Sequence, residues 1–250
     1  MENRELVDVV FKLGIGSNYA DRELRYALRS LYHFKDLGKV FVVGHKPSWL
    51  NDEKVIHIPA TDPYKASKDC NLINKLILAS VHPELSDQFL NMSDDQVFLR
   101  DIDASFFIKP IYDNTPMSKA LEPNKVLNKW QKRLRNTKNA LVKNHYSYNC
   151  YETHMPCLIN KHDFMTTIFK YDYGFDIGYV GNTLYYNTLR ANGRSLRPID
   201  LIRLGKKTLA SQIIREATGK VFLNYTNKAM DENLLNALDH LFPNKSVYEK

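Results

Sequence analysis

The chain has 250 residues, of which 44% are hydrophobic and 25% charged, so it can bury an ordinary core and its composition excludes intrinsic disorder. The 35 lysines and arginines exceed the 28 acidic residues and give a formal net charge of +7, which favours polyanionic partners without identifying one. The three cysteines match no metal-binding spacing, the sequence has no apolar run of about 20 residues, and no signal-peptide pattern follows Met1. We therefore expect a cytoplasmic protein with no membrane span. The composition does not indicate which oligomeric state the protein has.

The first predicted element is a strand over residues 6–13, followed by a loop that contains Gly14 and Gly16. Glycines after a first strand let the backbone approach a ligand closely, here a base or ribose. Gly-x-Gly also occurs in plain turns, and the third glycine of a dinucleotide-binding fingerprint is missing. Residues 21–31 follow as an amphipathic helix with arginines opposite its apolar face, which predicts a helix that covers a sheet.

Two short apolar strands over residues 40–44 and 55–59 come next, and then a second amphipathic helix over residues 68–80. This order of strand, helix, strand, loop and strand is typical of a parallel α/β sheet. We expect the second helix to place its apolar side chains inward. Its expected outward-facing residues are Lys68, Asn71, Asn74 and Lys75.

The following strand leads into two adjacent carboxylates, Asp94 and Asp95, and a second apolar run comes after them. Side-by-side carboxylates repel each other unless a cation or hydrogen-bond donors offset the charge. Hard oxygen ligands suit Mg²⁺ or Mn²⁺, and those metals bind diphosphates, so we predict a metal-bridged nucleotide diphosphate here. In a parallel sheet this pair and the loop 14–18 would face the same crevice. A solvated Ser-Asp-Asp turn is the alternative.

Four blocks in this part of the sequence resemble, in their order, the Stealth family of sugar-phosphate transferases. They are residues 23–31 (ELRYALRSL), 39–44 (KVFVVG), 47–51 (PSWLN) and 91–95 (NMSDD). They are also similar to nucleotide-diphosphosugar glycosyltransferases of the GT-A fold, in which an Asp-x-Asp-like motif binds the donor through Mn²⁺. Residues 151–156 are similar to a later block. Stealth proteins usually have an acidic Asp-Gly-Ser-Asp loop where residues 15–18 have no acid, a difference that affects phosphotransferase chemistry rather than donor binding.

The resemblance implies an α/β, GT-A-like fold: a Rossmann-like, mostly parallel sheet flanked by helices, with a helical C-terminal part that completes the acceptor side. It implies one domain over 1–250, with a nucleotide-sugar-binding half at 1–112 and an acceptor-binding half at 113–250. The implied donor-binding residues, the first five at the base and ribose, are Leu13, Gly14, Ile15, Gly16, Ser17, Arg22, Lys68, Asn71 and Asp94. Asp94 and Asp95 would bind the metal. Arg22, Lys68 and Asn71 have the alternative of being ordinary helix-surface residues.

Between residues 124 and 149 the sequence has no acidic residue, and basic and apolar side chains are interleaved. On a helix this pattern gives an apolar stripe with a basic flank. The flank and the aromatic residues after it are a candidate track for phosphates and stacked bases, and a solvated lysine-rich face is the alternative. The candidate nucleic-acid or acceptor residues are Lys129, Lys132, Arg133, Arg135 and Tyr148.

Glu152, His154 and Asp176 are the candidate catalytic residues. A hydroxyl acceptor loses its proton as it attacks an anomeric carbon, so an inverting enzyme needs a general base. His154 has two alternatives, as a metal ligand that joins Asp94 and Asp95 or as a core histidine bonded to a backbone carbonyl.

The end of the chain predicts a few further elements. Short helices are expected over residues 177–190 and 198–204, then a strand over 221–225 and an amphipathic closing helix over 231–242. The sequence shows no repeat and no long linker, which predicts that the chain folds as one unit.

These patterns, with the activity that the resemblance implies, predict a metal-dependent glycosyltransferase with a nucleotide-diphosphate sugar as donor, Mn²⁺ or Mg²⁺ as cofactor and a polyanionic acceptor. The first hypothesis for the acceptor is a hydroxymethylated base in DNA, as for a phage-encoded enzyme in the host cytoplasm, which would have to flip the base. A Stealth-like transfer of a sugar or sugar phosphate to a capsular or surface polysaccharide is one alternative. A non-enzymatic nucleic-acid-binding module is the other.

Overall fold

The computed structural model describes residues 5–65, 67–122, 126–175 and 177–250. Its main sheet has five strands in the order β3-β2-β1-β4-β7. These are β1 (Val7–Leu13), β2 (Leu37–Gly44), β3 (Val55–Pro59), β4 (Gln88–Met92) and β7 (Cys157–Asn160). The first four run parallel and β7 is antiparallel to β4, so the predicted, mostly parallel α/β sheet is confirmed.

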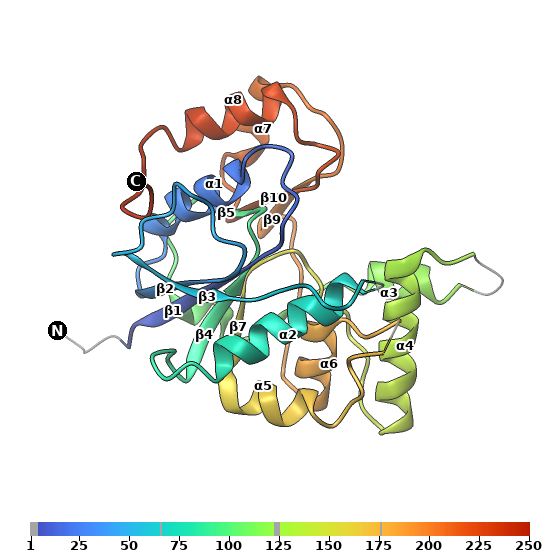
Figure 1. The fold of residues 1–250 in the computed structure, drawn as a ribbon. Helices are drawn as coiled ribbons and strands as arrows, with labels where there is room; N and C mark the ends of the chain where they lie inside the picture. The colour runs from blue at the N-terminus through green and yellow to red at the C-terminus, as the bar shows by residue number, and fades with distance from the viewer. Residues whose placement is uncertain (1–4, 66, 123–125, 176) are drawn as a thin grey trace.

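Helices cover both faces of this sheet (Figure 1). α1 (Arg22–Ser30) lies on one face, and α2 (Lys68–Ser80), α5 (Lys161–Ile168) and α6 (Gly181–Thr188) lie on the other. α3 (Thr115–Ala120) and α4 (Lys129–Lys143) stand beside α6. Across the residues that the structure describes, no helix combines the length and the apolar character needed to cross a membrane.

A second sheet lies next to α1 and has three strands in the order β5-β10-β9. They are β5 (Gln96–Phe98), β10 (Phe222–Tyr225) and β9 (Leu201–Leu204). Two helices, α7 (Ala210–Ala217) and α8 (Glu232–Leu241), pack against each other beyond α1. The remaining elements are a pair of short strands, β6 (Ile111–Tyr112) and β8 (Arg194–Ser195), and two 3-10 helices, η1 (Leu31–His33) and η2 (Ala104–Phe107).

The helix expected over residues 198–204 is wrong, because residues 201–204 form strand β9. Burial alternates along this strand, with Ile202 and Leu204 buried and Arg203 exposed. Its backbone pairs in parallel with β10, from Phe222 to Tyr225. A four-residue apolar run is too short to separate the helical from the strand periodicity. Pairing with a strand about 20 residues away in the chain therefore decided the conformation.

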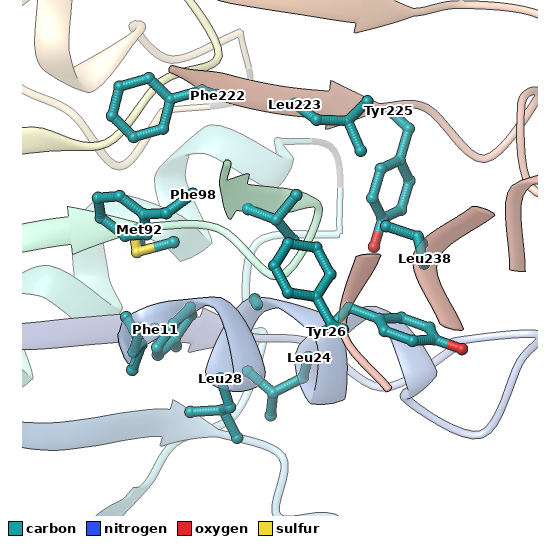
Figure 2. Packing of buried hydrophobic residues seen from close by; sticks show 14 of the residues in the cluster. Phe11, Leu24, Tyr26, Leu28, Met92, Phe98, Phe222, Leu223, Tyr225 and Leu238 are labelled. Carbon is teal, nitrogen blue, oxygen red and sulfur yellow. The ribbon is translucent and has the colours of Figure 1, made fainter. Parts of the chain in front are cut away.

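The largest apolar core joins the two sheets through α1 (Figure 2). Phe98 of β5 and Phe222 of β10 have ring centroids 5.1 Å apart, and Leu24 of α1 and Phe11 of β1 belong to the same cluster. Full burial of such a side chain contributes about 2 kcal/mol. The second sheet is therefore held firmly against the first, and residues 93–95 are where the chain passes from β4 in one sheet to β5 in the other.

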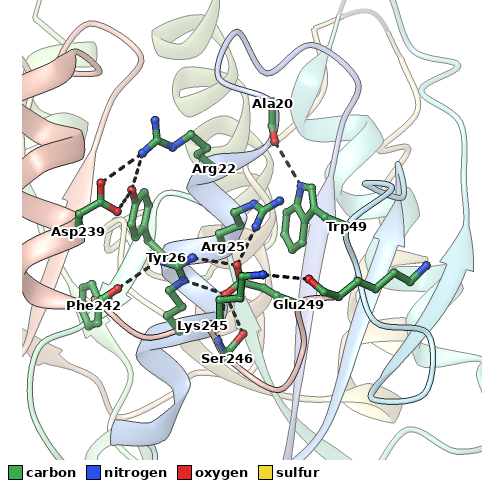
Figure 3. A network of polar contacts seen from close by, with 12 residues as sticks. Ala20, Arg22, Arg25, Tyr26, Trp49, Asp239, Phe242, Lys245, Ser246 and Glu249 are labelled. Carbon is green, nitrogen blue, oxygen red and sulfur yellow. Dashed lines mark hydrogen bonds and ion pairs between the residues drawn. The ribbon is translucent and has the colours of Figure 1, made fainter.

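The C-terminal residues fasten α1 to the loop between β2 and β3 (Figure 3). The carboxylate of Glu249 accepts hydrogen bonds from Arg25 at 2.9 Å and Arg29 at 2.8 Å, and the guanidinium of Arg25 lies 4.3 Å from the ring centroid of Trp49. The ring N–H of Trp49 donates to the carbonyl of Ala20 at 3.3 Å. This contact steadies the end of the loop that follows β1.

Candidate active site

A cleft of about 800 Å³ opens where β1 and β4 end. The loop after β1, the turn after β4, the start of α2, the start of α6 and one face of α4 contribute to its wall. Parallel α/β sheets bind ligands at the carboxyl ends of their strands, so this is where a site was expected. The predicted residues that line the cleft are Gly14, Ile15, Gly16, Ser17, Lys68, Asn71, Asp94, Asp95, Arg133, Glu152 and His154.

The acidic turn, residues 93–95, is held from both sides. The backbone carbonyl of Asp95 accepts hydrogen bonds from Nδ2 of Asn224 at 3.1 Å and from the backbone N–H of Tyr225 at 3.3 Å, both on β10. The backbone N–H of Ser93 donates to Oε1 of Gln96 at 3.0 Å. Because the backbone is fixed in this way, the carboxylates of the turn stay on the cleft wall.

Both carboxylates of the turn have raised pKa values. Burial and the charge of Asp95 raise the pKa of Asp94 to about 7, against the opposing charge of Lys68. Burial also raises the pKa of Asp95, again against Lys68. A cation placed between them would stabilise the ionised forms and lower both pKa values. The pair is therefore suited to bind one.

Two adjacent carboxylates fit a divalent cation that shares its coordination with the phosphates of a ligand. Mg²⁺ is commonly bound through one or two carboxylates plus substrate phosphates, and Asp94 and Asp95 offer such oxygens on the cleft wall. Within the described part of the chain, no group of three His, Cys, Asp or Glu side chains is arranged to hold a metal. His154 lines the cleft, but the structure does not bring it together with the two aspartates as the predicted third ligand.

His154 has a left-handed backbone with φ of 61°, which non-glycine residues adopt rarely. Burial and the charges of Arg203 and Lys68 lower its pKa to about 4. The imidazole is therefore neutral at pH 7. A base with so low a pKa accepts a proton poorly near neutrality, which makes His154 a weaker candidate for the general base than Glu152.

Glu152 is anchored at the start of α6. Its Oε1 accepts the backbone N–H of Thr183 at 3.0 Å, and its Oε2 accepts Nδ2 of Asn182 at 3.5 Å. Burial raises its pKa to about 7, against the opposing hydrogen bond from Thr183 and the charge of Lys12. A carboxyl group that titrates near neutrality can take up and release a proton at pH 7. The third predicted catalytic residue, Asp176, lies outside the described residues.

The loop after β1 presents its backbone and the exposed side chain of Ile15 to the cleft. Gly16 has a φ of 124°, which glycine adopts without steric cost. Ser17 supports the loop, because its hydroxyl donates to Glu23 at 2.8 Å and accepts two backbone N–H groups. The side chain of Leu13, by contrast, is buried in the core, so only its backbone is near this loop.

The face of α2 that was expected outward is partly covered by neighbouring loops. Asn71 is buried, and its amide clamps the backbone of Tyr64 by accepting its N–H at 2.9 Å and donating to its carbonyl at 3.1 Å. Lys75 is buried as well, and its Nζ donates to the carbonyl of Leu13 at 2.9 Å and pairs with Asp62 at 2.6 Å. The outward prediction is therefore wrong for Asn71 and Lys75, because segments after β1 and β3 fold over this part of the helix.

Arg22 is not among the residues that line the cleft. Its Nη2 donates to the hydroxyl of Tyr26 at 3.0 Å and to Asp239 at 3.4 Å, which ties α1 to α8 (Figure 3). Arg22 is thus an ordinary residue of the helix surface, which was the alternative to its predicted role in donor binding. The structure does not place it with the other donor-binding candidates.

The predicted acceptor residues on α4 differ in their exposure to solvent. Those exposed to solvent on the helix are Lys129, Lys132 and Arg135. Arg133 is instead buried, forms an ion pair with Asp69 of α2 and lines the cleft. Its assignment to an exposed phosphate track is therefore wrong, because the ion pair turns it inward. After the helix, Tyr148 is exposed, and Nζ of Lys138 lies 5.0 Å from its ring centroid.

Several residues of the cleft wall were not predicted from the sequence, among them Lys12, Trp130 and Asn182. Lys12 carried a signal, since it is a cation in the stretch 9–13, whose other residues are apolar. Trp130 is one of the apolar residues interleaved with the basic ones between residues 124 and 149, a pattern that predicts the apolar stripe of a helix. Asn182 lies in a polar stretch, and nothing in its local pattern sets it apart.

Comparisons with known proteins extend these observations. No family model matches the chain. The exopolysaccharide phosphotransferase CpsY of Mycobacterium leprae is 37% identical over 95 residues, which cover 35% of this chain and 18% of that protein. The chain therefore matches less than a fifth of the length of this relative.

Solved structures resemble this chain over nearly its whole length. The apo structure of the bifunctional glycosyltransferase WbbM has a TM-score of 0.55 and 12% identity, and covers 98% of this chain and 51% of its own. The galactosyltransferase LgtC, in complex with donor and acceptor sugar analogs, has a TM-score of 0.50 and 14% identity over 96% of this chain and 97% of its own. The chain has the GT-A fold of glycosyltransferases. The predicted likeness to GT-A proteins is confirmed at the level of fold, and the match to the mycobacterial protein confirms the Stealth resemblance over part of the chain.

Proposed function

We propose that this chain is a glycosyltransferase that moves a sugar from a nucleotide-diphosphate sugar to a hydroxyl acceptor, with Mn²⁺ or Mg²⁺ held by Asp94 and Asp95. The observation that carries the proposal is the position of this acidic pair, which follows β4 of a GT-A fold and lines a cleft of about 800 Å³. The structures of WbbM and LgtC, which resemble this chain, are those of glycosyltransferases, which supports the same reaction class.

The donor is proposed to lie between the loop after β1 and the acidic pair. Residues 14–17 offer backbone groups and an exposed isoleucine to a base and ribose. Lys68 lies on the cleft wall and its charge opposes those of the two aspartates, so it can form charge-assisted hydrogen bonds with a diphosphate. A divalent ion, when bound, would neutralise charge that grows on the departing diphosphate.

Glu152 is proposed to take the proton of the acceptor hydroxyl. As the acceptor oxygen bonds to the anomeric carbon, the bond from that carbon to the diphosphate oxygen breaks, and the proton passes to a carboxylate oxygen of Glu152. The pKa of about 7 and the place of Glu152 on the cleft wall support this role.

The proposed acceptor is an anionic polysaccharide. The exposed basic residues of α4 are on the same helix that contributes Trp130 to the cleft, so an acceptor bound there could extend toward the site. Such charges attract any polyanion, including DNA with hydroxymethylated bases. The description of the mycobacterial relative as an exopolysaccharide phosphotransferase favours the polysaccharide.

A second candidate reaction is the transfer of a sugar phosphate, which the same relative supports. In that reaction the acceptor oxygen attacks the phosphorus next to the sugar, the bond from this phosphorus to the bridging oxygen breaks, and a nucleoside monophosphate leaves. Sugar transfer instead releases a nucleoside diphosphate. The released nucleotide therefore distinguishes the two reactions.

The test incubates the protein with UDP-, GDP- and dTDP-linked sugars, MnCl₂ and mixed anionic oligosaccharides or hydroxymethylated DNA, and identifies the nucleotide released. Asp95→Asn should lower its release at least about 100-fold, since a ligand to the ion that stabilises the leaving group is lost. The matched control is Asp87→Asn, an exposed aspartate just before the opposite end of β4, which should keep wild-type turnover.

Full turnover in Asp95→Asn would contradict the role of the acidic pair. A wild-type protein that gains no thermal stability from any of these donors, with or without Mn²⁺, would contradict the enzymatic proposal, because a specific ligand raises stability by mass action. Nucleic-acid binding that persists in that case would support the non-enzymatic alternative.

A further inference from the structure

At the wall of the cleft, four polar side chains from four separate segments form one hydrogen-bonded chain. Nζ of Lys12 on β1 donates to Oδ1 of Asn91 on β4, and Nδ2 of Asn91 donates to Oδ1 of Asn182 on α6 at 3.2 Å. Nδ2 of Asn182 then donates to Oε2 of Glu152 at 3.5 Å. We propose that this chain is a positioning relay, in which Lys12 and Asn91 fix the orientation of Asn182 and Glu152 at the cleft wall.

Only one orientation of the two side-chain amides satisfies every donor and acceptor in the relay. An ammonium only donates and an ionised carboxylate only accepts, so each amide must turn its oxygen toward Lys12 and its nitrogen toward Glu152. A flipped Asn91 would present its NH₂ group to the ammonium and its oxygen to the oxygen of Asn182. Both contacts would be lost in a buried setting, where unpaired polar groups are costly. The charge at one end of the relay therefore sets the orientation of the amides in it.

Both ends of the relay are also anchored to the backbone. Nζ of Lys12 donates to the carbonyl of Met92 at 3.1 Å, directly before the acidic turn. At the other end, Oε1 of Glu152 accepts the backbone N–H of Thr183 at 3.0 Å. Lys12, Asn182 and Glu152 line the cleft, so the relay connects the strand that ends at the acidic turn with the proposed base.

The fold by itself gives little reason for a lysine at this position. Lys12 lies in β1, where the neighbouring Val10, Phe11 and Leu13 are fully or almost fully buried, and an apolar side chain of similar length would suit that strand. Replacing a buried ion by a well-packed apolar group is often neutral or stabilising for a fold. A buried lysine that ends in a directed chain of amides is better explained by what the chain positions.

The inference rests on the proposed function, in which Glu152 takes the acceptor proton. Loss of the ammonium would free Asn91 to turn, and Asn182 would then lose the donor that fixes its oxygen. Glu152 would keep its bond to the backbone but lose its second fixed partner. The geometry of the reacting groups would be disturbed, and the donor, held by the loop after β1 and the acidic pair, would bind nearly as before.

The first experiment compares the steady-state kinetics of Lys12→Met, Asn91→Leu and Lys75→Met. We expect kcat to fall at least about tenfold in the first two variants, with the donor KM within about threefold of the wild-type value. Lys75 is the matched control, since it is also a buried lysine of the cleft wall but bonds to Leu13 and Asp62. Lys75→Met should raise the donor KM more than it lowers kcat. A rise in KM with unchanged kcat in Lys12→Met would overturn the inference, because it would mean that Lys12 binds the donor.

The second experiment uses chemical rescue. Lys12→Ala opens a space at the cleft wall that matches propylammonium, and this cation should restore part of kcat. 1-Propanol, of the same length but neutral, should restore none. Equal rescue by both compounds, or by neither in a folded variant, would show that the side chain fills space and does not orient the amides by its charge.

A third measurement needs no turnover, so it separates this inference from the proposed function. In ¹⁵N-labelled protein the side-chain NH₂ groups of Asn91 and Asn182 should exchange slowly with solvent, and Lys12→Met should speed both while leaving the buried amide of Asn71 slow. Unchanged exchange in Lys12→Met would overturn the relay. Slow exchange that Lys12 controls, in a protein that releases no nucleotide from any donor, would confirm the relay and overturn the proposed reaction and the positioning role in it.

Discussion

The side-chain amide of Asn224 donates a hydrogen bond to the backbone carbonyl of Asp95 at 3.1 Å, although 129 positions separate the two residues in the chain. Asn224 lies on β10 of the second sheet and is almost fully buried. Asp95 ends the acidic turn on which the proposed metal site depends. A motif encoded in the first hundred residues thus has its backbone fixed by a strand near the C-terminus.

Asn224→Ala should therefore weaken Mn²⁺ binding about tenfold, since the loss of one hydrogen bond of about 1.4 kcal/mol would let the turn relax. Titration calorimetry with MnCl₂ measures this affinity directly. The control is Asn139→Ala, exposed on α4, which should leave it unchanged. If Asn224→Ala binds Mn²⁺ as tightly as the wild type while Asp95→Asn does not bind it, the turn holds its shape without the hydrogen bond from Asn224.

Arg133→Met should lower the free energy of unfolding by about 3 kcal/mol at pH 7, because it leaves the partly buried carboxylate of Asp69 without its ion-pair partner. The neighbouring change Lys132→Met removes an exposed charge and should cost less than about 0.5 kcal/mol. Urea denaturation of the two variants makes the comparison.

The same pair has a pH dependence with a defined sign. Burial raises the pKa of Asp69 even with Arg133 present, and removal of Arg133 would raise it further. Burial of the ionised Asp69 therefore lowers the free energy of unfolding at high pH. This destabilisation becomes smaller as the pH falls through the raised pKa of Asp69 in the folded protein, because the carboxyl takes up a proton, and it is gone below the pKa that Asp69 has in the unfolded chain. The stability gap between Arg133→Met and Lys132→Met should therefore narrow from pH 7 to pH 4, and a gap that widens would contradict this account.

Glu249→Gln should destabilise the protein at neutral pH. Burial would raise the pKa of Glu249, but the hydrogen bonds and charges of Arg29 and Arg25 outweigh it and the pKa lies below the usual 4.5. A lowered pKa contributes stability that is fully present above the unfolded value and is lost as the pH falls through the folded value. Urea unfolding should thus show a deficit at pH 7 of about 2 kcal/mol that shrinks below about pH 4.5. Glu53→Gln, at an exposed loop position, is the control and should show neither effect.

The triple variant Lys129→Gln, Lys132→Gln, Arg135→Gln should bind anionic polysaccharide more weakly and with a smaller dependence on salt, because fewer counterions are released. Affinity electrophoresis in gels that contain an acidic polysaccharide, run at two salt concentrations, gives both quantities. Nucleotide binding should stay at the wild-type level. Unchanged retention in the gel would contradict an acceptor track on α4, and a variant that loses only DNA binding would favour the nucleic-acid acceptor.

Much of the first hundred residues was predictable from local pattern alone. The strands β1 to β4, the amphipathic helix α1, the extent of α2 and the closing helix α8 were predicted correctly, as was the position of the doublet Asp94-Asp95 after β4. These features depend on residues close together in the chain, where a period of 2 or 3.6 and a strand end can be recognised. The outward face of α2 was predicted correctly only in part, because Asn71 and Lys75 are buried. The order of strands and helices was enough to predict a parallel α/β sheet, and from it the edge at which the cleft lies. The GT-A likeness was implied by the resemblance of the sequence blocks.

The tertiary structure decided what depends on distant partners. β9 is a strand because β10 pairs with it, and Arg133 turns inward because Asp69 of another helix meets it. Lys12, Asn91, Asn182 and Glu152 come from four segments, and no local period links them. A polar side chain is buried only where another segment supplies its hydrogen bonds, so sequence alone could name the acidic pair but could not show which polar residues would be enclosed beneath it.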